Sequence, residues 1–179
     1  MKRFRTAWFF FPFLLICGPA LAGDPFLEAG VAKNQVPISA PDFTLKVLEG
    51  KNLSLTDLKG KVVLLNFFEP WCPICRKEAV SFDRLGEEWK GQEAVFLQVA
   101  VKVEERELRR AKKEWNLSLP ILMDEGGKVA EAYDVNGHPE TLFVDRAGRI
   151  VGRSFGYKDW TSKSMTVLIQ HLLVSKTDR

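Results

Sequence analysis

The chain has 179 residues, of which 46% are hydrophobic and 27% charged, and this is typical of one globular domain rather than a disordered segment. Three cysteines and two histidines are too few for a disulfide-rich scaffold or a metal cluster with many ligands. Lys2, Arg3 and Arg5 account for the whole net charge of +3, so residues 23–179 are neutral and give no electrostatic basis for nucleic acid binding.

Residues 1–22 have the layout of a secretory signal peptide. Three basic residues precede an apolar run over 7–17, and Ala20-Leu21-Ala22 offers a cleavage site after Ala22. The alternative is an uncleaved anchor, although the run is short for a membrane span and Pro12 interrupts it. Cys17 is interpreted as an apolar residue of this run. We therefore expect a periplasmic or otherwise extracytoplasmic protein, which touches the membrane only through such an anchor.

The next stretch divides into a lead-in and the start of a domain. Residues 23–36 show no sustained pattern and are predicted to form an extended lead-in, with the domain over 37–175. Residues 42–47 and 52–55 flank the turn Glu49-Gly50-Lys51 and predict a β-hairpin. Residues 61–68 form an apolar, β-branched and aromatic run, which is typical of a strand buried on both faces.

A Cys-x-x-Cys pair follows this strand. After Cys75 the apolar residues recur at every third or fourth position up to Trp89, which predicts a helix. Cys72 therefore lies where the strand ends and the helix begins, and unpaired N–H groups and the helix dipole lower the pKa of a thiol there. Pro73 fits the first helical turn. Cys75 lies one turn further along the helix and is expected to be less exposed.

Such a pair in an exported domain is a structural disulfide, half of a metal site, or a redox couple. A disulfide that closes so short a loop constrains the unfolded chain little. A zinc site needs two further ligands, and the only histidines, His138 and His171, are isolated from each other in the sequence. These observations favour redox chemistry.

The rest of the chain alternates between strand and helix patterns. Strands are predicted at 94–101, 120–123, 140–144 and 150–155, and helices at 104–115, 128–133 and 161–173. The turn signal Asp145-Arg146-Ala147-Gly148 joins the last two strands into a hairpin. This order of elements predicts an α/β fold with three layers and a central mixed β-sheet.

Three stretches of sequence resemble the TlpA/ResA-like family of exported thioredoxin-fold proteins. They are Ala-Pro-Asp-Phe-Thr-Leu at 40–45, Leu-Lys-Gly-Lys-Val-Val-Leu-Leu-Asn-Phe at 58–67 with Trp-Cys-Pro-Ile-Cys at 71–75, and Gly-His-Pro-Glu-Thr-Leu-Phe-Val-Asp at 137–145. The resemblance implies a thioredoxin fold, to which the predicted N-terminal β-hairpin is an addition, and we expect no cofactor or metal. It implies thiol–disulfide exchange with exported proteins, with apocytochrome c as one target class and a membrane thiol relay as electron donor.

The resemblance also assigns roles to individual residues. Cys72 matches the nucleophile, Cys75 the resolving cysteine, and Glu78 a partly buried glutamate that tunes the thiols. Pro139 matches a cis-proline that faces the disulfide. We place the target-binding surface at Trp71, Pro73, His138 and Pro139.

Several acidic residues lie near the cysteine pair in the sequence. Some of them depart from the family pattern, and all of them bear on the redox potential of the cysteines. Glu69 precedes the pair where a small residue is common, and Glu140 follows Pro139 where Thr is frequent. With these carboxylates and Glu78 near the thiols, and no histidine between the cysteines, the thiolate is less stabilised than in a strong oxidant. A less stabilised reduced form lowers the potential, which favours a reductase or isomerase.

Three other functions are weighed against this one. His138 with the two cysteines suggests a copper-handling chaperone, although the cysteines of such chaperones are one residue further apart. The sequence pattern at residues 40–45 also occurs in peroxiredoxins, but nothing around Pro70 has the spacing of a peroxidatic motif. A binding module without turnover usually loses one cysteine, whereas both remain here.

Overall fold

The computed structural model describes residues 23–175, so the predicted signal segment, Cys17 included, lies outside the described residues. The elements in chain order are α1 (Pro25–Glu28), β1 (Ala32–Ser39), β2 (Thr44–Val47), β3 (Asn52–Ser54), the 3₁₀-helix η1 (Leu55–Leu58), β4 (Val62–Phe68), α2 (Pro73–Glu88), β5 (Ala94–Val101), α3 (Glu105–Trp115), β6 (Ile121–Asp124), α4 (Lys128–Ala132), β7 (Glu140–Val144), β8 (Arg149–Phe155) and α5 (Lys163–Val174). None of the helices in this part of the chain has the length and apolar character needed to cross a membrane.

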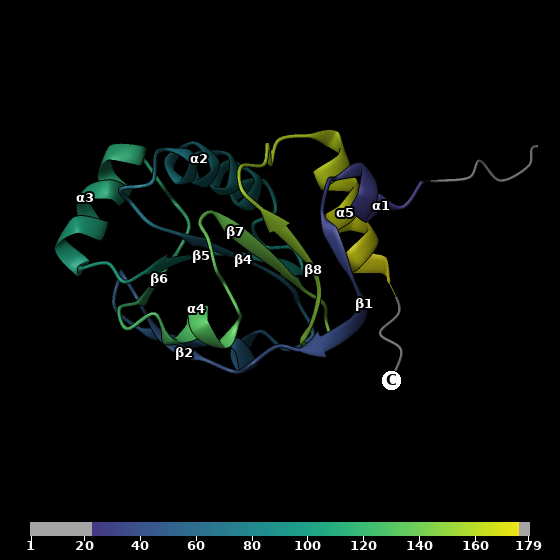
Figure 1. Ribbon diagram of the computed structural model, residues 1–179, viewed down its shortest axis with the longest axis horizontal. Helices are drawn as coiled ribbons and strands as arrows, with labels where there is room; N and C mark the ends of the chain where they lie inside the picture. Colours follow the sequence, from purple (N-terminus) through teal and green to yellow (C-terminus); the bar gives the residue numbers. More distant parts are fainter. Residues whose placement is uncertain (1–22, 176–179) are drawn as a thin grey trace, which may run out of the picture.

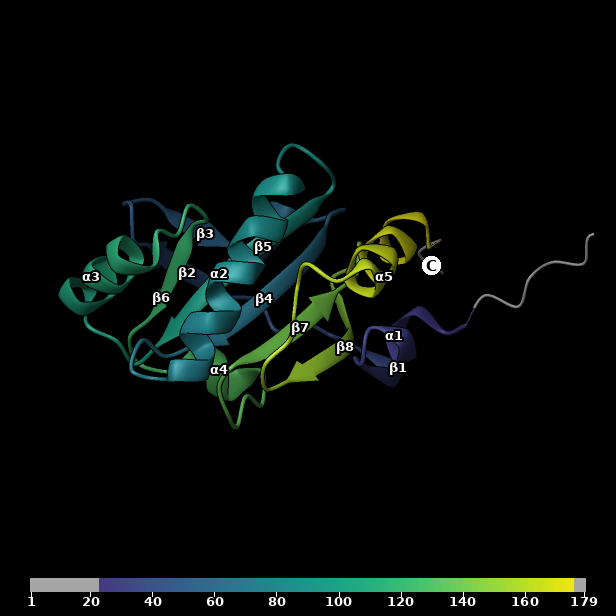
Figure 2. The same ribbon diagram turned by 90° about the horizontal axis from the view of Figure 1, so that it is seen from above.

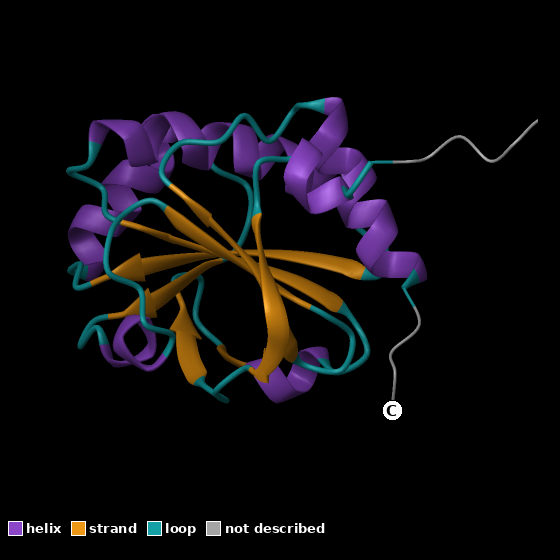
Figure 3. Ribbon diagram, turned by 45° about the vertical axis from the view of Figure 1, so that its right-hand side comes forward, coloured by secondary structure: helices purple, strands orange, loops and turns teal. Residues whose placement is uncertain are grey.

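The strands form one mixed sheet in the order β1-β8-β7-β4-β5-β6-β2-β3. Strand β4 lies at its centre, parallel to β5 and antiparallel to β7, and β5 pairs in parallel with β6 (Figure 2). The β2–β3 hairpin extends one edge of the sheet, where β2 pairs with β6. This pairing confirms the predicted N-terminal hairpin. The sheet is strongly twisted, as Figure 3 shows.

Helices cover both faces of the sheet and complete three layers. Helices α1, α2, α3 and α5 lie on one face, and α4 lies on the other (Figure 1). Every residue of β4 is buried because both faces of this strand contact core clusters. Leu64 packs toward α2 and α5, whereas Leu65 packs toward η1 and α4. The continuous apolar run that predicted this strand therefore reflects its central position.

The segment predicted as an extended lead-in is part of the folded domain. Asp24 caps α1 by accepting a hydrogen bond from the N–H of Phe26 at 2.9 Å, and the Phe26 ring is buried in the core. Strand β1 then pairs with β8 as an edge strand. A four-residue helix and a strand with mostly exposed side chains leave no sustained hydrophobic period, so the sequence pattern did not reveal them.

Candidate active site

The cysteine pair lies at the junction between β4 and α2. Cys72 is the N-cap of α2 and has an extended backbone, and Pro73 occupies the first helical turn. Cys72 and Cys75 form a disulfide with their Cα atoms 5.2 Å apart. The N–H of Cys75 also donates to Sγ of Cys72 at 3.2 Å. One of the free N–H groups at the start of the helix is thus directed at the sulfur of Cys72.

The two sulfurs differ in exposure. Cys75 is fully buried, whereas Cys72 is only partly buried. Trp71 and Ile74 beside them expose about half of their surface, at 54% and 53%. Cys72 is therefore the sulfur that an incoming group reaches first, across an apolar rim.

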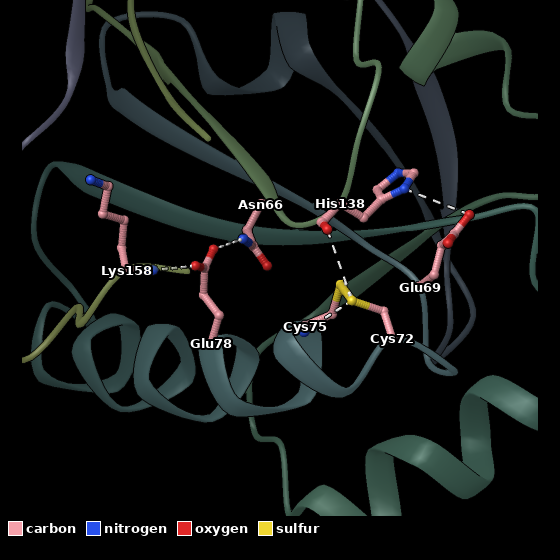
Figure 4. The surroundings of a disulfide bond; sticks show 7 residues. All are labelled: Asn66, Glu69, Cys72, Cys75, Glu78, His138 and Lys158. Atoms are coloured by element: carbon pink, nitrogen blue, oxygen red, sulfur yellow. Dashed lines mark hydrogen bonds and ion pairs between the residues drawn. A yellow bond between two sulfur atoms is a disulfide. The ribbon is translucent and has the colours of Figure 1, made fainter. Parts of the chain in front are cut away.

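The loop before β7 approaches the disulfide from the other side. The peptide bond between His138 and Pro139 is cis, and the carbonyl oxygen of His138 lies 3.9 Å from Sγ of Cys72 (Figure 4). The carbonyl of Pro139 accepts a hydrogen bond from the N–H of Gly156 at 2.9 Å, which fixes the loop to the end of β8. Residues far apart in the sequence, at 71–75 and 138–139, thus form one site.

Glu78 lies one turn after Cys75 and is 1% exposed. Its carboxylate accepts hydrogen bonds from Asn66 Nδ2 at 2.8 Å and from the N–H of Lys158 at 2.6 Å (Figure 4). Burial raises the pKa of Glu78 to about 7, although these hydrogen bonds oppose the rise. Asn66, which also donates to Thr141 Oγ1 at 2.9 Å, was not predicted. Its sequence signal is a lone amide within an otherwise apolar strand.

The imidazole of His138 points away from the sulfurs and toward Glu69 (Figure 4). Nδ1 of His138 lies 3.6 Å from Oε1 of Glu69. The histidine therefore meets Cys72 through its backbone and not through its ring. Within residues 23–175 no group of three or more His, Cys, Asp or Glu side chains is placed to hold a metal ion.

Glu140 is not beside the thiols, contrary to the expectation from its place next to Pro139. Its side chain lies on the face of β7 shared with Leu142, which packs on the α4 side of the sheet. There it accepts a hydrogen bond from Arg153 Nη1 at 2.7 Å, and Arg153 also donates to the carbonyl of Tyr133 at 2.6 Å. Burial raises the pKa of Glu140, against the influence of Arg153. The alternation of side chains along a strand explains the error.

Comparisons with known proteins agree with this geometry. The AhpC/TSA family matches residues 37–153. The thiol–disulfide oxidoreductase ResA of Bacillus cereus is 30% identical over 159 residues, which cover 87% of this chain and 91% of ResA. A secreted disulfide oxidoreductase of Mycobacterium tuberculosis, homologous to DsbE of E. coli, is 25% identical with a TM-score of 0.59, covering 73% of this chain and 93% of that one. A thiol:disulfide interchange protein DsbE of Chlorobium tepidum shares the fold, with a TM-score of 0.70 at 23% identity. The match covers 76% of this chain and 96% of the DsbE chain.

Proposed function

The chain belongs to the AhpC/TSA family and is a thiol–disulfide oxidoreductase of the ResA type, and on this basis we propose that it reduces or isomerises disulfides of exported proteins. The observation that carries the proposal is the asymmetry of the pair. Cys72 is accessible at the start of α2, and Cys75 is buried behind it. This arrangement suits one sulfur that attacks a target and one that resolves the product.

In the proposed reaction, the thiolate of reduced Cys72 attacks one sulfur of a target disulfide. The target disulfide breaks, a mixed disulfide forms, and the leaving target sulfur takes a proton. Cys75 then loses its proton and attacks Sγ of Cys72, which releases the second target sulfur as a thiol. The target gains two electrons, and the Cys72–Cys75 disulfide re-forms. Trp71, Pro73, His138 and Pro139 border the accessible sulfur, and we assign the target segment to this surface.

Glu78 is proposed to tune the buried sulfur. Its carboxylate is one helical turn from Cys75, and with a pKa of about 7 it exchanges protons at the pH at which thiols react. A carboxylate in this position also disfavours a second negative charge nearby, which supports a reducing rather than an oxidising couple. Because Glu140 faces the other side of the sheet, the carboxylates left on the side of the thiols are those of Glu78 and Glu69.

We further propose that the protein works outside the cytoplasm. The support is the signal-like segment at 1–22, together with a secreted relative of the same fold. An apocytochrome c, whose haem-attachment cysteines must be reduced, is the target class that we favour. A membrane thiol relay is the proposed electron donor.

Trapping of mixed disulfides tests this function. Cys75→Ser leaves the attacking sulfur in place but removes the resolving one, so covalent complexes with natural targets should accumulate in the native exported proteome. Cys72→Ser is the matched control and should trap none. Recovery of no complex with Cys75→Ser, or of equal amounts with both variants, would contradict a thiol-transfer role. Identification of the trapped proteins tests the proposed target class.

A further inference from the structure

Glu69 and His138 lie on the two loops that hold the reactive sulfur. The N–H of Cys72 donates to the carbonyl of Glu69 at 3.2 Å, and Sγ of Cys72 lies 3.9 Å from the carbonyl of His138. The side chains of Glu69 and His138 face each other at 3.6 Å and are only 25% and 16% exposed (Figure 4). This acid–base pair therefore joins both loops next to a sulfur that changes its charge with its redox state.

The imidazole of His138 also borders an open cavity of about 300 Å³. Its Nε2 is buried and has no hydrogen-bond partner among the described residues. The charged groups that line the same cavity are Lys102 after β5, Glu131 in α4 and Asp134 after α4, in addition to Glu69. With Nδ1 toward Glu69, Nε2 is the ring nitrogen without a hydrogen-bond partner, and it is the atom at which the neutral imidazole can take up a second proton.

We propose that His138 holds one of the two protons that accompany reduction of the Cys72–Cys75 disulfide. A dithiol donor supplies two electrons and two protons and itself becomes a disulfide. The bond between the two sulfurs breaks, Cys75 takes one proton, and His138 Nε2 takes the other. Cys72 is left as a thiolate, and Glu69 stabilises the imidazolium of His138, whose backbone carbonyl lies against the same sulfur. The inference rests on the thiol–disulfide chemistry of the proposed function, and it is independent of the targets and of the direction of electron flow.

The electrostatics of Glu69 and His138 support a coupling between the proton on His138 and the charge on Cys72. Burial is the largest cause that lowers the pKa of His138, Lys102 lowers it further, and Glu69 opposes both. The imidazole of the oxidised protein is therefore neutral at pH 7. A thiolate at Cys72 adds a negative charge and makes the imidazole a stronger base. By reciprocity, a proton on His138 stabilises the thiolate to the same extent.

Nuclear magnetic resonance titration of the two histidines tests the proposal in a single sample. His171 lies in α5, away from the disulfide, and serves as the internal reference. We expect the proton affinity of His138 to rise about three- to tenfold on reduction, as for an opposite charge at moderate range, and that of His171 to stay constant. Equal proton affinities of His138 in the two redox states would overturn the proposal.

Variants separate the effect of the charge from a rearrangement of the loops. Cys72→Ser removes the thiolate, so His138 should bind protons as in the oxidised protein; a persistent increase would overturn the proposal. In His138→Asn, the equilibrium constant with glutathione should vary more with pH, rising by up to tenfold per pH unit across the range in which His138 titrates, because two glutathione thiols give up two protons and the variant takes up one fewer. His171→Asn is the matched control and should follow the unmodified protein. An unchanged pH dependence in His138→Asn would also refute the proposal. None of these readouts requires a protein target.

Discussion

Replacing Glu78 by Gln should remove a pH-dependent loss of stability. In the unfolded chain this carboxyl titrates near the ordinary glutamate pKa of 4.5, whereas in the folded protein burial raises its pKa to about 7. Between these values the unfolded state has released its proton and the folded state has not, so the unfolding free energy falls as pH rises. A difference of about 2.5 pKa units corresponds to a loss of about 3 kcal/mol between pH 4.5 and pH 8.

Gln has nearly the same shape and does not titrate. Its amide nitrogen meets the donor Nδ2 of Asn66, but a flip of the Asn66 amide presents Oδ1, which has no hydrogen-bond partner within residues 23–175. The flipped amide gives up its bond to Thr141, which costs about 1 kcal/mol at every pH. The stability of Glu78→Gln relative to the unmodified protein should therefore improve by about 3 kcal/mol from pH 4.5 to pH 8.

Urea unfolding of the oxidised protein at several pH values between 4.5 and 8 measures this difference. Glu88→Gln, at an exposed position of the same helix, is the matched control and should differ from the unmodified protein by a constant amount. A difference between Glu78→Gln and the unmodified protein that does not change with pH would refute the reasoning. It would show that Glu78 has an ordinary pKa despite its burial.

Two further predictions concern the packing of α2. Gly86→Ala should destabilise the fold by about 1–3 kcal/mol in thermal or urea unfolding, since the added Cβ would lie 2.5 Å from Leu119 Cδ1 and 2.9 Å from Phe96 Cβ. An unchanged stability would mean that these neighbours move freely. Asp83→Ala should cost about 2–4 kcal/mol, because this buried carboxylate accepts hydrogen bonds from the N–H groups of Ser118 and Leu119, which are left without a partner. Asp83→Asn should recover part of the loss, and a loss equal to that of Asp83→Ala would argue against hydrogen bonding as the cause.

Local patterns predicted the elements that carry the site. The strand before Cys72 is marked by its continuous apolar run, and the helix after it by apolar spacing and by Pro73 at its start. Predicted and observed bounds of most elements agree within about two residues, as expected where a hydrophobic period is strong. The resemblance also placed Pro139 in the loop that faces the disulfide, where the structure has a cis peptide bond.

Contacts between distant segments could not be predicted in the same way. Glu140 is next to Pro139 in the sequence, yet the alternation along β7 turns its side chain to the opposite face, where the partner is Arg153 on the neighbouring strand. Asn66 meets Glu78 only because α2 packs on β4 in this register. The pairing of Glu69 with His138 requires two loops that are about 70 residues apart to meet at the disulfide.

The pairing of β1 with β8 determines where the domain can be shortened. A fragment that begins at residue 37, the first residue of the family match, would cut β1 in two and remove α1. It would lose the pairs of Ala32 with Arg153 and of Lys33 with Gly152, and it would uncover the backbone of Gly152, on which the Phe26 ring packs. The free outer edge of β8 would then be a template for edge-to-edge aggregation, so a soluble fragment should begin no later than Asp24.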